Sequence, residues 1–331
     1  MTTLTSPTDL LAAVPFLIGY APQDSLVVIG LRGDELSLAM RVDYPFEIDP
    51  DQIDTLASHL VKEESDGALL VAYLPDDLLD SECVMTPLRE AIAMRDIKVR
   101  ECVEVKNGRW KSVICDDPNC CPKEGAPLPN SDSTRIAAEQ VAQGKPLPYA
   151  NLDQLLDSIK SESSAEITAF VKKIKPINYK KPGVQVLQRE GALAVNDLVA
   201  EFAQKGISKD NLLMALVLQR LNDLQVRDYA MGIVSEENIE NMWRMWRHLM
   251  KLAPNGFIAP VATLFSAVNY EKGDGSMAAK ALDKALTDDP NYPLAKLLKR
   301  VYAAGWPPDS FAKMRAELHP KVISALFGNP E

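Results

Sequence analysis

The chain has 331 residues, of which 47% are hydrophobic and 25% are charged, a composition typical of a globular protein with room for two domains. No stretch approaches the roughly 20 apolar residues of a membrane span, and the first residues lack the basic start of a secretory signal. Five cysteines, an odd number in a long chain, do not suit a secreted disulfide framework. We therefore expect a soluble cytoplasmic protein that does not bind membranes.

The net charge of −10 is unevenly distributed along the chain. Residues 34–82 hold 14 acidic and 2 basic residues, so the rest of the chain is close to neutral. An acidic surface repels phosphate backbones, and we therefore expect this half not to bind nucleic acid. The simplest interpretation is a solvated, soluble surface.

The first half alternates between strand and helix patterns. The predicted elements are strands 25–31 and 36–43, helix 49–64, strand 68–74, helix 76–95 and the hairpin 97–115. The order ββ-α-β-α-ββ predicts an α/β fold, a mixed sheet with packed helices. Neither the glycine-rich dinucleotide fingerprint nor a phosphate-binding P-loop follows any of these strands.

The predicted hairpin contains the turn dipeptide Asn107-Gly108, because both residue types tolerate positive φ. A two-residue loop fixes the register of the two strands. Val105 should then face Trp110, and Glu104 should face Lys111 as an opposite-charge pair.

Four cysteines lie in or near residues 102–121. In the predicted register Cys102 faces Val113 and shares a sheet face with Cys115, and diagonal neighbours in a sheet lie roughly 7–8 Å apart. A structural zinc site is one hypothesis, with the ligands Cys102, Cys115, Cys120 and Cys121. The Cys-x4-Cys-Cys spacing argues against zinc, and we expect no cofactor. A redox-active disulfide and packed, reduced cysteines are the alternatives.

Several separate segments share the pattern of one known family. Residues 10–28 read Leu-Leu-Ala-Ala-Val-Pro-Phe-Leu-Ile-Gly-Tyr-x-Pro-x-Asp-Ser-Leu-Val-Val, and residues 115–122 read Cys-Asp-Asp-Pro-Asn-Cys-Cys-Pro. These resemble the start and the central signature of an actinobacterial family, domain of unknown function 4192. Arg227-Asp228, Gly273-Asp274-Gly275 and Asp289-Pro290 resemble its C-terminal part. The resemblance implies a bacterial cytosolic protein and brings no activity or site residue.

We expect three regions: an α/β domain over residues 1–121 that ends in the cysteine loop, a connecting segment with short helices over 122–182, and a helical domain over 183–331. Residues 172–181 hold five lysines around Pro176. We interpret them as a solvated linker, with phosphate or partner binding as the alternative.

The last region shows helical spacing of apolar residues throughout. Residues 212–218 are apolar nearly all round, which predicts a helix at the centre of a bundle. Residues 264–305 read as helix, Lys-Gly-Asp-Gly, helix, Asp-Asp-Pro-Asn-Tyr and helix. This resembles one tetratricopeptide-type hairpin followed by a third helix, and it suggests partner binding.

No catalytic motif is present: the sequence lacks a Gly-x-Ser-x-Gly elbow, and its three histidines lie in no recognisable motif. Arg227-Asp228, expected in a turn between two helices, is interpreted as a structural tie or as an anion-binding pair. Together with Asp24 and Ser25 it forms the candidate pocket.

We expect a non-enzymatic interaction or regulatory protein with a protein partner. The alternative is an enzyme of unfamiliar type, a hydrolase or a thiol-redox protein, with its site between the two halves.

Overall fold

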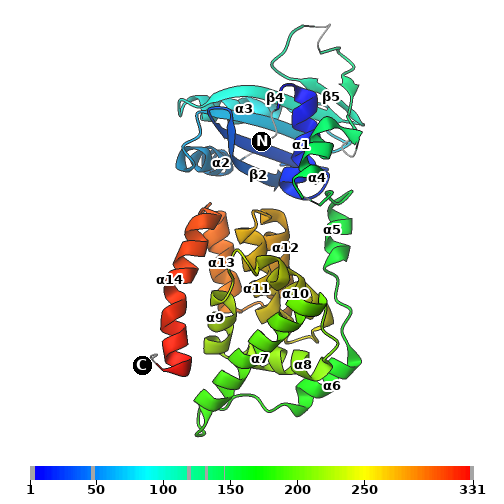
Figure 1. The fold of residues 1–331 in the computed structure, drawn as a ribbon. Coiled ribbons are helices and arrows are strands. Elements are labelled where there is room, and N and C mark those ends of the chain that lie inside the picture. Colours follow the sequence, from blue (N-terminus) through cyan, green and yellow to red (C-terminus); the bar gives the residue numbers. More distant parts are fainter. Residues whose placement is uncertain (1–3, 46–48, 118–120, 131–132, 145, 329–331) are drawn as a thin grey trace. The chain divides into compact units, whose positions relative to one another are not determined.

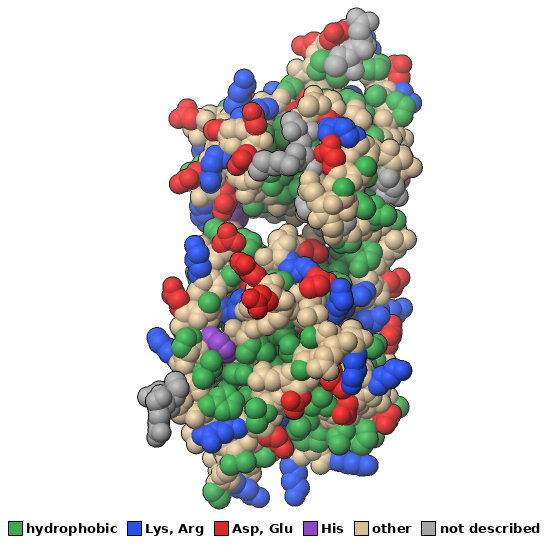
Figure 2. Space-filling view, viewed as in Figure 1, with side chains coloured by type: hydrophobic (Ala, Val, Ile, Leu, Met, Phe, Trp, Pro, Cys, Tyr) green, Lys and Arg blue, Asp and Glu red, His purple; other side chains and the backbone are tan. Residues whose placement is uncertain are grey.

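The computed structural model describes residues 4–45, 49–117, 121–130, 133–144 and 146–328. The chain divides into two units, Met1–Leu155 and Leu156–Glu331, called unit 1 and unit 2 below (Figure 1). Residues 122–155 of the predicted connecting segment thus belong to unit 1, and residues 156–182 belong to unit 2. Charged side chains of both signs are interspersed over the visible face of each unit (Figure 2).

Unit 1 is built on a mixed sheet with the strand order β2-β1-β3-β4-β5-β6. Neighbouring strands are antiparallel except β3 and β4, which are parallel. The strands are β1 (Ser25–Arg32), β2 (Glu35–Asp43), β3 (Gly67–Tyr73), β4 (Lys98–Lys106), β5 (Arg109–Ser112) and β6 (Ala126–Pro127). The predicted mixed sheet with packed helices is confirmed.

Helices cover both faces of this sheet, which explains why β1 and β3 are apolar runs rather than alternating strands. The helices α2 (Pro50–Lys62) and α3 (Glu82–Ala93) pack on one face, where the core includes Leu26, Leu70 and Cys102. Residues of opposite parity in the strands point to the other face. That face is covered by α1 (Pro7–Ile18) and α4 (Arg135–Ala142) (Figure 1).

The predicted β4–β5 hairpin is confirmed in its turn, its register and both of its side-chain pairs. Asn107 and Gly108 have φ of 50° and 70°, as a two-residue turn of this kind requires. Val105 pairs with Trp110, and Glu104 pairs with Lys111, whose Nζ lies 3.1 Å from Glu104 Oε1.

Capping residues define both ends of helix α1. Ser6 caps the start by accepting a hydrogen bond from Asp9 N at 3.1 Å, and Pro7 occupies the first turn, where its missing N–H costs nothing. Gly19, with φ of 87°, ends the helix in the left-handed conformation. Between these ends the helix buries its residues from Leu10 to Pro15.

Unit 2 is helical in all of its described elements. After α5 (Leu152–Ser158), which spans the division between the units, it contains α6 (Ala165–Lys173), α7 (Val184–Lys205), α8 (Asn211–Arg220), α9 (Leu224–Gly232), α10 (Ile239–Leu252), α11 (Ile258–Glu271), α12 (Gly275–Asp288), α13 (Pro293–Ala303) and α14 (Pro308–Phe327). Across the described parts of the chain, every helix is too short or too polar to span a bilayer.

The most buried helix is α11, whose residues are buried from Ile258 to Asn269. The prediction that residues 212–218 form the central helix was wrong: they lie in α8, and Leu212 is 54% exposed. Helix α11 packs antiparallel to α12 and is closed at its start by Asp288 at the end of α12. The Asp288 carboxylate accepts hydrogen bonds from the backbone of Gly256, Ile258 and Ala259.

A buried ion pair fastens α14 to α11. Arg315 Nε lies 2.6 Å from Glu271 Oε1, and Arg315 Nη2 lies 2.9 Å from Glu271 Oε2. Arg315 Nη1 also donates to the carbonyls of Gly232 and Val234 at 3.0 and 2.8 Å, at the end of α9. One guanidinium therefore joins three helices.

Candidate functional site

Two of the predicted site residues, Asp24 and Ser25, lie where the chain enters β1. Asp24 has φ of 44°, so the backbone turns sharply before the strand. Ser25 is fully buried; its hydroxyl donates to Gln23 O at 2.5 Å and accepts from Arg41 Nε at 2.8 Å. A hydroxyl whose proton is already donated to a carbonyl is not poised as a nucleophile. Ser25 instead positions the Arg41 guanidinium.

Asp24 lines a polar pocket of about 450 Å³, which also contains Tyr20, Arg41, Asp43 and Asp153. Arg41 Nη1 pairs with Asp43 Oδ1 at 2.5 Å. Burial raises the pKa of the Tyr20 hydroxyl, although the charge of Arg41 opposes the shift. Three carboxylates and one guanidinium leave this pocket negative, which favours hydroxyl or amine donors over anions.

The other two predicted residues, Arg227 and Asp228, lie inside α9, so the prediction of a turn between helices was wrong. The helix begins earlier because Asp223 caps it, accepting from Gln225 N and Val226 N. Arg227 Nε and Nη2 donate to Asp228 Oδ1 at 2.9 and 2.6 Å, and the guanidinium also hydrogen-bonds the Tyr292 side chain. Arg227 thereby ties α9 to the turn between α12 and α13.

Asp24 and Ser25 belong to unit 1, whereas Arg227 and Asp228 belong to unit 2. The structure describes each unit by itself. A site shared by the four residues therefore stays a prediction.

The cysteines of the predicted zinc set differ in their surroundings. Cys102 is buried in the core beneath α2 and α3, and this burial raises the pKa of its thiol to about 12. Cys115 and Cys121 are half-buried, and Cys120 lies outside the described residues. Within the described ranges, no three His, Cys, Asp or Glu side chains gather as metal ligands. The zinc hypothesis, which includes Cys120, stays a prediction.

A cavity that sequence reasoning missed lies beside α1 on the opposite sheet face from Cys102. We call it the α1 cavity; its volume is about 710 Å³. Small-molecule sites have volumes of roughly 300–1,000 Å³ and mostly apolar walls. The apolar part of the walls is mainly leucine side chains from α1 and the strands beneath: Leu10, Leu17, Leu31, Leu36 and Leu69. This lining is suited to an apolar molecule.

One end of the α1 cavity is polar. Arg100 donates to Asp34 Oδ1 at 3.1 Å and to Asp66 Oδ1 at 3.0 Å. A Cβ at Gly67 would lie 2.6 Å from Arg100 Nε, so glycine is needed for the guanidinium to lie there. The neighbouring Glu101 accepts from Cys102 N and from the Ser112 hydroxyl through Oε1. The two carboxylates that line this end outweigh its one guanidinium.

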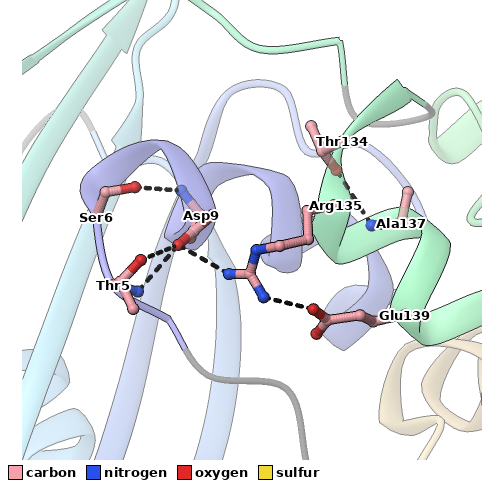
Figure 3. Close-up of polar contacts among 7 residues, drawn as sticks. All are labelled: Thr5, Ser6, Asp9, Thr134, Arg135, Ala137 and Glu139. Carbon is pink, nitrogen blue, oxygen red and sulfur yellow. Dashed lines mark hydrogen bonds and ion pairs between the residues drawn. The ribbon is translucent and has the colours of Figure 1, made fainter.

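Contacts between α1 and α4 hold the start of α1, which lines the α1 cavity (Figure 3). Asp9 accepts from Thr5 N at 3.0 Å, from Thr5 Oγ1 at 2.7 Å and from Arg135 Nη2 at 3.2 Å. Partial burial acts to raise the pKa of Asp9, but these hydrogen bonds and the Arg135 charge outweigh it and lower the pKa. Thr5 and Ser6, which line the α1 cavity, are thereby fixed in place.

The sequence did contain a signal for α1, although not for the cavity. Ser6, Pro7 and Asp9 form a helix start, and Gly19 forms a helix stop, on either side of the apolar run. The interrupting Pro15 obscured this pattern. The cavity itself depends on how α1, α4 and the sheet pack together, and no local pattern reports that.

Fold and site together define a protein with a ligand-sized cavity in an α/β unit and with a separate helical unit. A family model described as Domain of unknown function (DUF4192) matches residues 7–309, so the chain belongs to this family and the resemblance is confirmed. No curated protein and no solved structure matches the chain.

Proposed function

We propose that the chain is a non-enzymatic regulatory protein whose unit 1 binds a small amphipathic molecule in the α1 cavity. The observation that carries the proposal is the cavity itself, with about 710 Å³ of space, an apolar lining that is mainly leucine, and the charged groups of Asp34, Arg100 and Glu101. Binding of this kind transmits a signal by stabilising the bound conformation.

The chemistry of the polar end selects the class of ligand. Arg100 is already paired with Asp34 and Asp66, and Glu101 adds another carboxylate. A carboxylate headgroup would meet like charges there, whereas an amine or a hydroxyl would find acceptors. We therefore propose a ligand with an apolar body and a hydrogen-bond-donating head.

The state of two potential nucleophiles, Ser25 and Cys102, supports binding rather than catalysis. The Ser25 hydroxyl is held by Arg41 and by a backbone carbonyl, and burial raises the pKa of the Cys102 thiol far above neutrality. Neither group is activated for attack on a substrate.

Thermal unfolding of the full chain with decylamine, decanol and decanoate, each below its micelle concentration, tests the proposal. We expect Tm to rise with the amine and the alcohol and to rise less with the carboxylate. Ala13→Phe and Leu17→Trp, which fill the cavity, should abolish the rise. Ala93→Phe, at an exposed position at the end of α3, should keep it. Equal responses of the filled and control variants would contradict the proposal.

A second function is proposed for unit 2, the binding of a protein partner. Its support is the arrangement of α11, α12 and α13, joined by the short turns 272–274 and 289–292, which is the order of a tetratricopeptide-type hairpin and a following helix. Apolar surface is also exposed on α7: Val186 and Leu193, 67% and 53% exposed, lie seven residues apart and share a face.

A crosslinking pull-down from the native cytosol, comparing the wild type with a Val186→Ser, Leu193→Ser double variant, tests this second function. We expect the wild type to recover one specific protein and the variant to lose it. Both substitutions replace exposed side chains, so the free energy of unfolding should stay within about 0.5 kcal/mol of the wild type. Recovery of the same proteins by both chains would contradict the proposal.

A further inference from the structure

One face of the β4–β5 hairpin carries three basic side chains close together. Lys106 pairs with Arg109 in the register of the two strands, and Glu104 pairs with Lys111. Because side chains alternate along a strand, all four lie on the same face of the sheet. With Lys123 they line a cavity of about 220 Å³, called the hairpin pocket here.

The positive charge of the hairpin pocket is only partly neutralised. Lys111 pairs with Glu104, whose other oxygen already accepts from Ser81 N and the Ser81 hydroxyl at 2.9 and 2.8 Å. Lys106 donates to a backbone carbonyl, that of Leu78. A carbonyl satisfies a donor without cancelling its charge.

Arg109 is held in the same way, by the carbonyls of Glu124 and Gly125 at 2.8 and 2.6 Å. In the described part of the chain, neither Arg109 nor Lys106 forms an ion pair with a carboxylate. Glu124 also lines the pocket, so its four cations face two carboxylates, of which Glu104 is already paired. This local excess of positive charge stands out in a chain of net charge −10.

The loop that carries Lys123, the fourth cation of the pocket, packs against the hairpin. Gly125 has φ of 73°, and a Cβ there would lie 2.8 Å from Trp110 O, so the loop lies directly against β5. Arg109 fastens the same loop through its two carbonyl contacts. The backbone of the loop that carries Lys123 is thereby held beside the hairpin.

We propose that the hairpin pocket binds the phosphate group of a small phosphorylated molecule. Several N–H donors with uncompensated charge converge there, and a compact dianion satisfies such donors better than a carboxylate does. The pocket also includes the 88% exposed Leu79, which offers apolar surface to the organic part of the ligand.

Calorimetric titration of the full chain with inorganic phosphate and with phenyl phosphate, at low ionic strength in a phosphate-free buffer, tests this site. We expect both to bind, the ester more tightly, and binding to weaken as salt is added. Lys123→Gln and Lys106→Gln should each weaken binding about tenfold, as expected when one charged hydrogen-bond donor is lost. Equal affinity for phenyl phosphate and inorganic phosphate would mean that the site binds free phosphate rather than a phosphorylated molecule.

Lys98→Gln, an exposed change at the opposite end of β4, is the matched control and should leave affinity within about twofold. Unfolding of each variant without ligand checks that the fold is kept. If Lys106→Gln disturbs it by freeing the Leu78 carbonyl, Lys123→Gln decides. Absence of binding by the wild type, or an equal loss in Lys98→Gln, overturns the proposal.

Discussion

The guanidinium of Arg315 and the carboxylate of Glu271 face each other in a bidentate pair, and each side chain is only 6% exposed. Removing one member of a buried pair leaves an uncompensated charge, which costs about 3 to 5 kcal/mol. We expect Arg315→Met and Glu271→Leu to lower the free energy of unfolding in urea by that amount. The double variant should be more stable than either single variant, because it leaves no buried charge. A single variant within about 1 kcal/mol of the wild type would show that the pair is dispensable.

Replacing Gly125 should lower the free energy of unfolding by more than its positive φ alone implies. Gly125→Ala introduces both backbone strain and a Cβ at 2.8 Å from the Trp110 carbonyl, whereas Gly33→Ala, with φ of 59°, introduces strain alone, since nothing lies within 4 Å of its Cβ. We expect Gly125→Ala to cost about 1 to 3 kcal/mol more than Gly33→Ala in urea unfolding. Equal costs would mean that the contact with Trp110 relaxes freely.

His319 should make stability depend on pH. Burial lowers the pKa of His319, and the charge of Arg315 lowers it further. The unfolded chain therefore takes up the proton first as the pH falls, so the stability that neutral His319 contributes is present above about pH 6.5 and is lost below it. We expect the free energy of unfolding to decline as the pH falls below about 6.5, less steeply in His319→Gln. Parallel pH profiles would exclude His319 as a contributor.

The cysteines should differ sharply in reactivity. Cys83 is exposed, whereas Cys102 is fully buried and its thiol has a raised pKa. Because the thiolate is the reactive form, maleimide should label Cys83 in the native chain and Cys102 only in denaturant. Peptide mapping by mass spectrometry distinguishes the two sites. Labelling of both at similar rates in the native chain would show that the core beneath α3 opens readily.

Sequence patterns predicted the hairpin well because its information is local. A two-residue turn at Asn107 and Gly108 leaves one register, and that register fixes which residues face each other. The α/β order was recovered for the same reason, although α3 begins at Glu82 rather than at residue 76.

The position of the central helix was missed because the buried polar side chains of α11 donate their hydrogen bonds to backbone carbonyls. Thr263 donates to Ala259 O, Ser266 donates to Ala278 O, and Asn269 donates to Phe265 O. These bonds allow polar side chains to be buried at little cost. Helix α11 is therefore buried although Thr263, Ser266 and Asn269 interrupt its apolar residues, whereas residues 212–218 of α8 form an unbroken apolar run. The cavity and the hairpin pocket depend on tertiary packing, which no single segment encodes.

The shortest strand has a consequence for how the molecule behaves in a crowded solution. β6 covers one border of the sheet with two residues and ends in Pro127, which has no N–H to offer. A foreign strand therefore finds no continuous hydrogen-bonding partner there. The other border, β2, has nine residues, so any growth of this sheet between molecules is directed to that single side.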